Sequence, residues 1–267
     1  MSLPEGQPKL TVLTASYNSL EGLRRTVASV SSQMYANYEH VVVDGGSSDG
    51  TADWLARNGD RINWISEPDD GIADALNKGL DMASGEWILV LHADDTFADR
   101  HSLEQVAPFL KTATDIVSCD VLFETPDRSR LIRSRGFSPW INFKTTIPHQ
   151  GAFCRDSLVS RIGTFDTSLR VVLDYEFFLR AHRSKATVDV VHIALSRMPG
   201  TGVSSRRDWP SLHARFEEER AVHRMHCPNL AMWMIYRCYW PLYMTYRWIR
   251  SRLRGLSGSP SVAPNDS

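Results

Sequence analysis

The chain has 267 residues, with 30 Lys and Arg against 31 Asp and Glu, and 42% of its residues are hydrophobic. The near-neutral charge gives no reason to expect nucleic acid as a partner, and the apolar content is that of a globular protein with one large domain and room for an appendage. We expect no secretory signal, because the first residues lack an apolar segment, and no spanning helix, because no uncharged apolar run reaches about 18 residues. The four cysteines are widely spaced and form no CxxC pair, which favours unpaired, mostly buried thiols in a cytosolic protein over a zinc site.

Apolar strands alternate with amphipathic helices in the first third of the chain. The predicted strands span residues 10–15, 40–43, 61–65 and 87–91, and the predicted helices lie around residues 23–30, 52–56 and 72–83. We expect Asn18 or Ser19 to cap the first helix and Gly85 to end the third. This alternation predicts an α/β fold with a parallel sheet wound by helices.

A polar turn follows each of the four strands. The turns comprise Ser16 to Asn18, Asp44 to Ser48, Glu67 to Asp70 and His92 to Asp95. Right-handed crossovers place all four at the same edge of the sheet, which is where open α/β sheets bind ligands. Strand ends are commonly polar, but the richness of these turns in Asp and Gly favours a ligand crevice.

The fourth turn carries two adjacent carboxylates, Asp94 and Asp95, directly after a continuous apolar strand. A divalent cation is the simplest reason for this pair, because carboxylate oxygens are its preferred ligands. The alternative is a solvated turn that caps the helix that follows.

The second half of the chain is mixed rather than alternating. Helices are predicted near 103–110, 157–162, 174–180 and 209–226, strands over 115–123, 128–135, 150–154 and 187–195, and loops over 137–148 and 199–204. We therefore expect this half to extend the sheet and to supply the second wall of the crevice.

Residues 229–254 interleave tryptophans and tyrosines with arginines, a composition typical of the bilayer interface. A helix packed on the domain with exposed arginines is the alternative, and Pro241 is expected to kink either helix. The Ser/Pro/Gly-rich tail over 255–267 is predicted to be disordered. The expected organisation is a domain over 1–226, a helical, membrane-interfacial segment over 227–254, and the tail.

Six segments resemble family 2 glycosyltransferases of the GT-A fold, and in this order and spacing they are highly specific. They are TASYN (14–18), VDGGSSDGT (43–51), EPDDGIADALNKGL (67–80), GEWILVLHADD (85–95), PHQGAFCR (148–155) and LDYEFFLR (173–180). The resemblance covers about residues 9–205. It is strongest to bacterial enzymes of exopolysaccharide, capsule, colanic-acid-type polymer and lipopolysaccharide synthesis.

This resemblance implies a Rossmann-like, mostly parallel sheet with helices on both faces and a mixed C-terminal half. It also implies an inverting hexosyl transfer from a nucleotide-diphosphate sugar, UDP-linked by default, to a glycan or lipid-linked acceptor. A protein of this kind is expected in the cytoplasm, with peripheral contact at the inner face of the cell membrane.

The resemblance assigns the catalytic base to Asp174, which is also placed to cap its helix. Asp94 and Asp95 match the family's acidic motif, which contacts the donor ribose and coordinates Mg²⁺ or Mn²⁺ through the diphosphate. At the first position of that motif, where Asp is frequent, this chain has His92. His92 is therefore a candidate metal or ribose ligand, with a purely structural histidine as the alternative.

The remaining assignments concern the nucleotide and the acceptor. The candidate donor-binding residues are Ser16, Tyr17, Asn18, Asp44, Asp70 and Lys78, the last on a helix face shared with Asp74 and Asn77. His149 matches an acceptor-side loop and is a candidate phosphate or acceptor ligand. Gly45 stands where many relatives have a second Asp, so uridine is a default and not a deduction. Thr201 to Ser204 resembles a loop that closes over the donor, followed by Arg206 and Arg207 as candidate diphosphate ligands.

Two other functions remain open at this stage. A sugar nucleotidyltransferase is disfavoured because TASYNSLEG lacks the glycine-rich, basic loop of that class. A non-catalytic protein of the same fold is disfavoured by the presence of Asp174 together with Asp94 and Asp95.

Overall fold

The computed structural model describes residues 7–200 and 208–256, with side chains through Arg252. The predictions for the loop Thr201 to Ser204, for Arg206 and Arg207, and for the tail beyond residue 256 lie outside the described residues. The chain divides into two compact units, Met1–Gly202 (unit 1) and Val203–Ser267 (unit 2). The predicted helix at 209–226 thus belongs to unit 2, whereas the sequence suggested that it closes the first domain.

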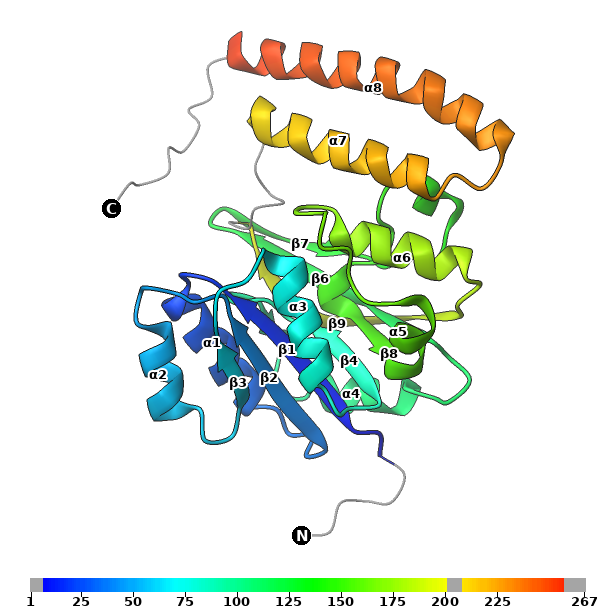
Figure 1. The fold of residues 1–267 in the computed structure, drawn as a ribbon. Coiled ribbons are helices and arrows are strands. Elements are labelled where there is room, and N and C mark those ends of the chain that lie inside the picture. Colours follow the sequence, from blue (N-terminus) through cyan, green and yellow to red (C-terminus); the bar gives the residue numbers. More distant parts are fainter. Residues whose placement is uncertain (1–6, 201–207, 257–267) are drawn as a thin grey trace. The chain divides into compact units, whose positions relative to one another are not determined.

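Unit 1 is built on a mixed sheet (Figure 1). Its strands are β1 (Leu10–Ser16), β2 (Tyr38–Asp44), β3 (Asn63–Ser66), β4 (Trp87–Val90), β5 (Thr96–Phe97), β6 (Ile116–Thr125), β7 (Arg128–Ile132), β8 (Ala152–Arg155) and β9 (Val188–Pro199). Within the described residues the order is β3-β2-β1-β4-β8-β6-β9-β5, with β7 paired to β6. The sequence did not predict β5, which is too short to show a periodic pattern.

The four N-terminal strands are parallel, with Ser16 beside Asp44 and Asp44 beside Ser66. The turns that follow them therefore begin side by side at one sheet edge, as predicted. β8 is antiparallel to both β4 and β6, while β9 is parallel to β6. The predicted α/β class, with a parallel first half and a mixed second half, is confirmed.

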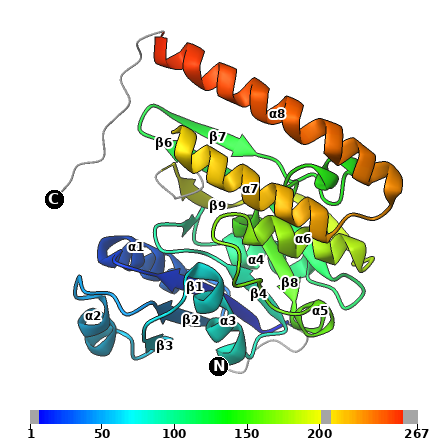
Figure 2. The same ribbon diagram turned by 45° about the horizontal axis from the view of Figure 1, so that its top comes forward.

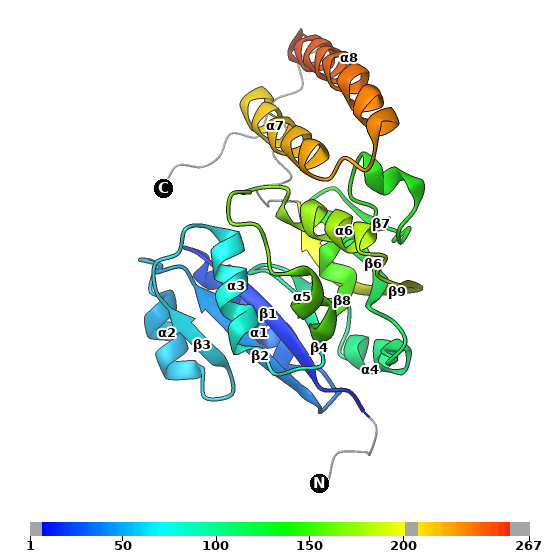
Figure 3. The ribbon, with the colours of Figure 1, turned by 45° about the vertical axis from the view of Figure 1, so that its right-hand side comes forward.

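Helices cover both faces of the sheet. They are α1 (Leu20–Ser31), α2 (Thr51–Asn58), α3 (Ile72–Met82), α4 (Ser102–Val106), α5 (Asp156–Ile162) and α6 (Leu173–Arg183), with 3-10 turns η1 (Ala107–Phe109), η2 (Pro139–Asn142) and η3 (His149–Gly151). Val12 of β1 packs in a buried cluster with Val30 of α1 and Leu103 of α4. Leu13, the next residue, faces α3 on the other side, and Figures 1 and 2 show α1 and α3 on opposite sides of β1. In Figure 3, α5 and α6 lie on the α3 side.

Two glycines allow close packing around β1. A Cβ at Gly79 of α3 would lie 2.1 Å from Leu13 Cδ1, so the helix can approach the strand only without a side chain there. A Cβ at Gly85 would lie 2.5 Å from the backbone nitrogen of Thr11. The prediction that Gly85 ends α3 was wrong, because the helix ends at Met82 and Gly85 instead permits contact between two backbones.

Unit 2 is a helical hairpin of α7 (Trp209–Met225) and α8 (Leu230–Leu256). His223 of α7 stacks on Tyr236 of α8 with ring centroids 4.4 Å apart and accepts a hydrogen bond from Trp240 Nε1 at 3.1 Å. α8 continues as a helix through Pro241. Among the described residues, no helix combines the length and hydrophobicity needed to cross a bilayer.

The four cysteines are free, as predicted, but only two of them are buried, whereas most were expected to be. Cys119 and Cys154 are buried in unit 1, and burial raises the pKa of each thiol to about 12. Both thiols are therefore protonated packing groups and not nucleophiles.

Candidate active site

The first two turns are joined by hydrogen bonds. Asn18, which has a φ of 45°, accepts from the backbone N–H of Ser48 at 2.9 Å, and its own N–H donates to Ser47 Oγ at 2.7 Å. Asp49 Oδ2 accepts from the N–H of Leu20 at 2.8 Å. Ser19 occupies the N-cap position, as predicted, but makes no side-chain cap hydrogen bond, and Asn18 bonds across to Ser48 instead. The cap of the first helix is therefore supplied by Asp49, directly after the second turn.

Asp44 is fully buried at the end of β2, and its carboxylate accepts several bonds. Oδ2 accepts from the N–H of Ser47 at 3.0 Å and from Ser66 Oγ at 2.7 Å, and Oδ1 accepts from the Ser47 hydroxyl. Asp44 therefore holds the second turn against the third. Nearby, the Ser16 hydroxyl is buried and has no hydrogen-bond partner among the described residues, while Tyr17 is 65% exposed.

The third turn places Asp69, not Asp70, against the second. A Cβ at Gly45 would lie 2.4 Å from Asp69 Oδ2, so the Asp69 carboxylate fills the space beside Gly45. Asp70 is exposed, and its N–H donates to Asp74 Oδ2 at 3.2 Å. The sequence offered one signal for Asp69, namely the unusual glycine at position 45.

The predicted donor face of α3 is used for internal contacts. The side-chain amide of Asn77 donates to the carbonyl of Phe165 and accepts from its N–H, both at 2.9 Å. Lys78 pairs with Glu67 at 2.8 Å and Asp74 at 3.4 Å, and the hydrogen bond to Glu67 is the main cause that raises the pKa of Lys78. Lys78 therefore orders the third turn in this structure, and its contact with a donor stays a prediction.

The fourth turn is fixed by α1. Thr26 Oγ1 accepts from the N–H of Asp94 at 3.0 Å and donates to the carbonyl of Asp95 at 2.8 Å. Arg25 forms an ion pair with the Asp94 carboxylate, and a Cβ at Gly22 would lie 2.8 Å from that carboxylate. Sequence reasoning missed these three α1 residues, although their i, i+3, i+4 spacing places them on one helix face.

The two adjacent carboxylates differ in environment. Asp94 has a φ of 86° and a side chain that is 31% exposed, so its carboxylate reaches the surface. Asp95 is 4% exposed and accepts from the N–H of His92 at 3.2 Å. Burial raises the pKa of Asp95 to about 7. Asp94 is thus the more accessible candidate ligand, and Asp95 the more desolvated one.

Three residues from distant parts of the chain meet beside the fourth turn. His149 Nδ1 lies 3.2 Å from Asp174 Oδ2, and the rings of His149 and His92 make an edge contact at 5.0 Å. The other carboxylate oxygen of Asp174 accepts from the N–H of Tyr175 at 2.8 Å. Asp174 follows the first residue of α6 and not the cap position, which is Val172.

The pKa values of the two histidines are shifted in opposite directions. Burial lowers the pKa of His92 to about 3, and the neighbouring His149 adds to this shift. Burial acts on His149 in the same sense, but the hydrogen bond to Asp174 and its charge outweigh it and raise the pKa of His149. Within the part of the chain that the structure describes, His92 Nδ1 and His149 Nε2 are both buried without a hydrogen-bond partner. A neutral imidazole with an unpartnered nitrogen can ligate a metal or bond to a substrate.

The structure thus brings the predicted residues together in two groups. Ser16, Tyr17, Asn18 and Asp44 belong to the joined turns after β1 and β2, whereas His92, Asp94, Asp95, His149 and Asp174 gather at the turn after β4. Asp70 and Lys78 lie at the third turn. In the part of the chain that the structure describes, no three His, Cys, Asp or Glu residues converge as a complete metal site.

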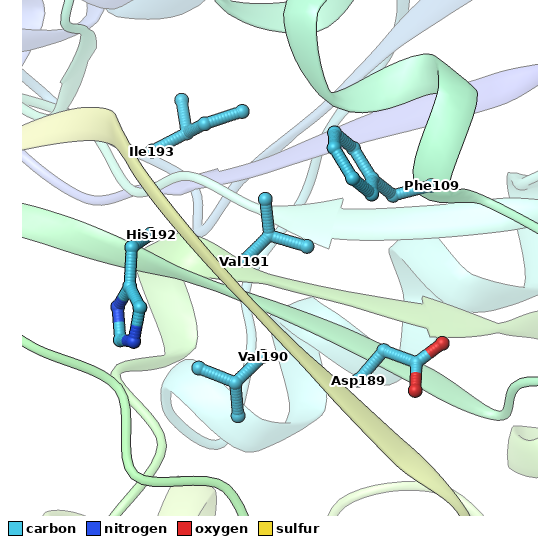
Figure 4. Close-up of a pocket in the computed structure, with 6 residues that line it drawn as sticks. All are labelled: Phe109, Asp189, Val190, Val191, His192 and Ile193. Atoms are coloured by element: carbon cyan, nitrogen blue, oxygen red, sulfur yellow. The ribbon is translucent and has the colours of Figure 1, made fainter.

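A depression elsewhere in unit 1 contains none of the predicted residues. It has a volume of about 510 Å³ and is lined by Phe109 and by five consecutive residues of β9, Asp189 to Ile193. Figure 4 shows Phe109 on the same side of β9 as Val191, with His192 on the other side. Since its walls are largely one strand and one ring, it lacks the converging polar groups of an active site.

Comparison with known proteins gives consistent matches. The model of the family described as Glycosyl transferase family 2 matches residues 11–173. An uncharacterized glycosyltransferase of Mycobacterium tuberculosis is 34% identical over 81% of this chain and 85% of its own length. A PGL/p-HBAD biosynthesis glycosyltransferase of Mycobacterium bovis is 31% identical over 68% of this chain and 72% of its own.

Solved structures share the fold at lower identity. Staphylococcus aureus TarS 1–349 in complex with UDP-GlcNAc has a TM-score of 0.64 and 19% identity, over 82% of this chain and 65% of that one. The mannosyltransferase PcManGT from Pyrobaculum calidifontis, in complex with GDP-Man and Mn²⁺, has a TM-score of 0.60 and 19% identity, over 95% of this chain and 88% of that one.

Proposed function

This chain belongs to glycosyltransferase family 2, and we propose that it transfers a sugar from a nucleotide-diphosphate donor to a hydroxyl of a glycan or lipid-linked acceptor with inversion at the anomeric carbon. The observation that carries this proposal is the contact of Asp174 with His149, which in turn touches His92 beside the fourth turn. This arrangement supports Asp174 as a base that acts beside the acidic turn.

Asp174 is the proposed base. A single displacement with inversion needs a group that takes the proton of the acceptor hydroxyl as the new bond forms. Asp174 Oδ1 accepts a hydrogen bond from the N–H of Tyr175, and Oδ2 pairs with His149 Nδ1. These two contacts fix the orientation of the carboxylate. His149 then acts through Asp174, and its unpartnered Nε2 is free to meet the acceptor or a phosphate.

The residues of the fourth turn fit a divalent cation. Asp94 and Asp95 offer oxygen ligands, and His92 offers a neutral imidazole whose Nδ1 has no partner. This oxygen-rich set suits Mg²⁺ or Mn²⁺. When bound, the ion would neutralise the charge that develops on the leaving diphosphate. We propose that Asp94, the accessible member, contributes most directly and that Asp95 holds the turn.

The nucleotide is proposed to bind across the first three turns. Among the described residues the Ser16 hydroxyl has no hydrogen-bond partner, and Tyr17 is exposed. Asn18 is held through Ser47, which is itself bonded to Asp44. The structures of TarS and PcManGT contain UDP-GlcNAc and GDP-Man, respectively, which supports a nucleotide-sugar donor for this chain but does not select the nucleotide base. UDP remains our default.

The acceptor is proposed to be a bacterial surface polysaccharide or glycolipid intermediate. The similarity to a PGL/p-HBAD biosynthesis glycosyltransferase supports this class. An acceptor of this type is made at a membrane, so we propose a cytoplasmic enzyme that works peripherally at the inner face of the cell membrane.

The test begins with donor identification by thermal shift across UDP- and GDP-sugars with and without Mn²⁺, since a ligand of the native state raises its stability. Asp174→Asn should then lower the rate of transfer more than roughly 100-fold, because a general base contributes at least that much to the rate. The donor should still bind. The matched control is Asp156→Asn, an exposed acid in the first turn of α5, which should leave transfer unchanged.

Undiminished turnover by the Asp174 variant would remove it as the base. A product with retained anomeric configuration, measured by NMR, would contradict the inverting mechanism.

A further inference from the structure

α8 exposes large apolar side chains along most of its length. Its large exposed side chains are Leu230, Trp233, Met234, Ile235, Leu242, Tyr246, Trp248 and Ile249, and we call this surface the outer face of α8. The opposite side packs on α7 through Tyr236 and Trp240, which are 6% and 4% exposed. Leu242 is 72% exposed, so its side chain is not part of the packed core between α7 and α8. A soluble surface rarely exposes so many large apolar side chains on a single helix.

Charges are divided unequally between the two helices. The α8 sequence contains five arginines and no aspartate, glutamate or lysine. The acidic residues in the described part of unit 2 are Asp208, Glu217, Glu218 and Glu219, all on α7 or at its cap. The hairpin therefore has one basic helix with an apolar face and one helix that carries the carboxylates.

The arginines of α8 lie against its aromatic rings. Arg237 lies over the Trp233 ring at 5.4 Å, and Arg252 lies over the Trp248 ring at 5.3 Å. Arg250 donates to the Tyr246 hydroxyl at 3.1 Å. Tryptophan and tyrosine are enriched at the level of lipid headgroups, and arginine beside them can reach lipid phosphates.

We propose that α8 lies flat in the headgroup region of an anionic bilayer, with its outer face toward the acyl chains and its arginines at the phosphates. Only the purpose of this contact rests on the proposed function: it would hold the enzyme at a membrane-bound acceptor. A helix of 27 residues is about 40 Å long, enough for a line of contacts along the surface.

Two alternatives fit the surface less well. α8 is not a spanning helix, because no described helix is long and apolar enough. A second copy of the chain on the same face would bring two arginine-rich helices together with no carboxylate on either α8 to compensate. An anionic lipid surface satisfies both the apolar and the basic character.

The test measures sedimentation of the full chain with vesicles. Binding should be strong with phosphatidylcholine that contains about one third phosphatidylglycerol, weak with phosphatidylcholine alone, and reduced by salt. Leu242→Glu should lower the partition coefficient at least tenfold, since it places a carboxylate in the outer face. The matched control is Met225→Glu, an α7 residue that is 57% exposed, which should have little effect.

A second variant tests the charges. Replacing Arg237, Arg250 and Arg252 together by Gln should weaken binding roughly fivefold per arginine and should remove most of the salt dependence. Near-UV circular dichroism of the tryptophans checks that the hairpin is intact, and Ile249→Glu replaces Leu242→Glu if that variant misfolds.

Equal binding to both vesicle types, or equal losses in the α7 and α8 variants, would overturn the proposal. A wild type that ignores vesicles but is dimeric by light scattering would assign the face to a second copy. Donor binding by calorimetry is measured on the same samples. Failure of vesicle binding with intact donor binding refutes only the membrane contact, whereas failure of donor binding refutes the proposed function.

Discussion

Asp69 and Asp70 are neighbours with different surroundings. Asp70 was predicted as the nucleotide-side acid from the motif, yet it is exposed and only its backbone bonds to Asp74. The Asp69 carboxylate occupies the space beside Gly45, next to the Tyr17 ring. We therefore expect Asp69 to supply the negative charge that a side chain at position 45 provides in many relatives.

This predicts a difference between two adjacent variants. Asp69→Ala should weaken nucleotide binding by roughly tenfold or more, because a hydrogen bond that involves a charged group contributes about 1.5–3 kcal/mol. Asp70→Ala, its matched control, should change binding much less. Calorimetric titration with the nucleoside diphosphate measures both, and a larger effect at position 70 would favour Asp70, the acid predicted from the motif.

His149 touches the proposed base and not the joined turns of the nucleotide site. His149→Phe keeps a ring against His92 but removes the bond to Asp174. We expect kcat to fall roughly 10- to 100-fold with donor affinity nearly unchanged, because the lost bond orients a charged group. His101 pairs with Glu104 at 2.8 Å on the surface, so His101→Phe is the matched control. A loss confined to donor affinity would instead make His149 a donor ligand.

Among the secondary-structure elements, α1 has the widest role in the site. Its first residue, Leu20, is capped by Asp49 of the second turn, and Arg25 and Thr26 hold the fourth turn. The helix thus couples a nucleotide-side turn to the acidic turn. The apolar periodicity predicted that α1 exists, but it carried no information about the partners of its polar face.

The packing of α3 on β1 gives a prediction at the same scale. Gly79→Ala should destabilise unit 1 by about 1–2 kcal/mol, since the new methyl group would overlap Leu13 and overpacking outweighs the gain in helix propensity. Urea denaturation measures the change. Adding Leu13→Val removes the overlapping methyl and should recover part of the loss; strict additivity of the two changes would show that they do not interact.

At the scale of the whole molecule, buried histidines make stability depend on pH. Burial lowers the pKa of His40 from 6.5 to about 3. The unfolded chain therefore binds the proton first as pH falls, so the contribution of His40 is complete above about pH 6.5 and is lost progressively toward pH 3. His92 has a shift of the same direction and cause.

His40→Gln isolates the first of these contributions. Between pH 6 and pH 4 the free energy of unfolding of the wild type should fall more steeply than that of the variant, by up to about 1.4 kcal/mol per pH unit. Gln can still bond to Thr14, whose hydroxyl lies 3.0 Å from His40 Nε2. Denaturation curves at several pH values measure this difference, and parallel pH profiles for the two proteins would contradict it.

The two units carry different kinds of surface. Among the described residues, the candidate catalytic, metal-binding and donor-binding side chains all belong to unit 1, and the outer face of α8 belongs to unit 2. From its composition, the C-terminal segment was expected to begin near residue 227. Unit 2 begins earlier, because α7 packs on α8 through His223 and Phe216. Which helix covers another depends on side chains that meet across the hairpin, and composition alone does not show them.

The sequence by itself determined the alternation of strands and helices, the four polar turns and the family, because apolar periodicity and motif spacing are local properties. It also predicted Asp174 as the base, a role that stays a prediction, but it did not predict the contact of Asp174 with His149. Only the tertiary structure decided that Asp69 lies against Gly45, that α1 holds the fourth turn, and that His149 joins Asp174 to His92. These contacts link residues far apart in the chain, and they follow from strand register and helix packing rather than from any local pattern.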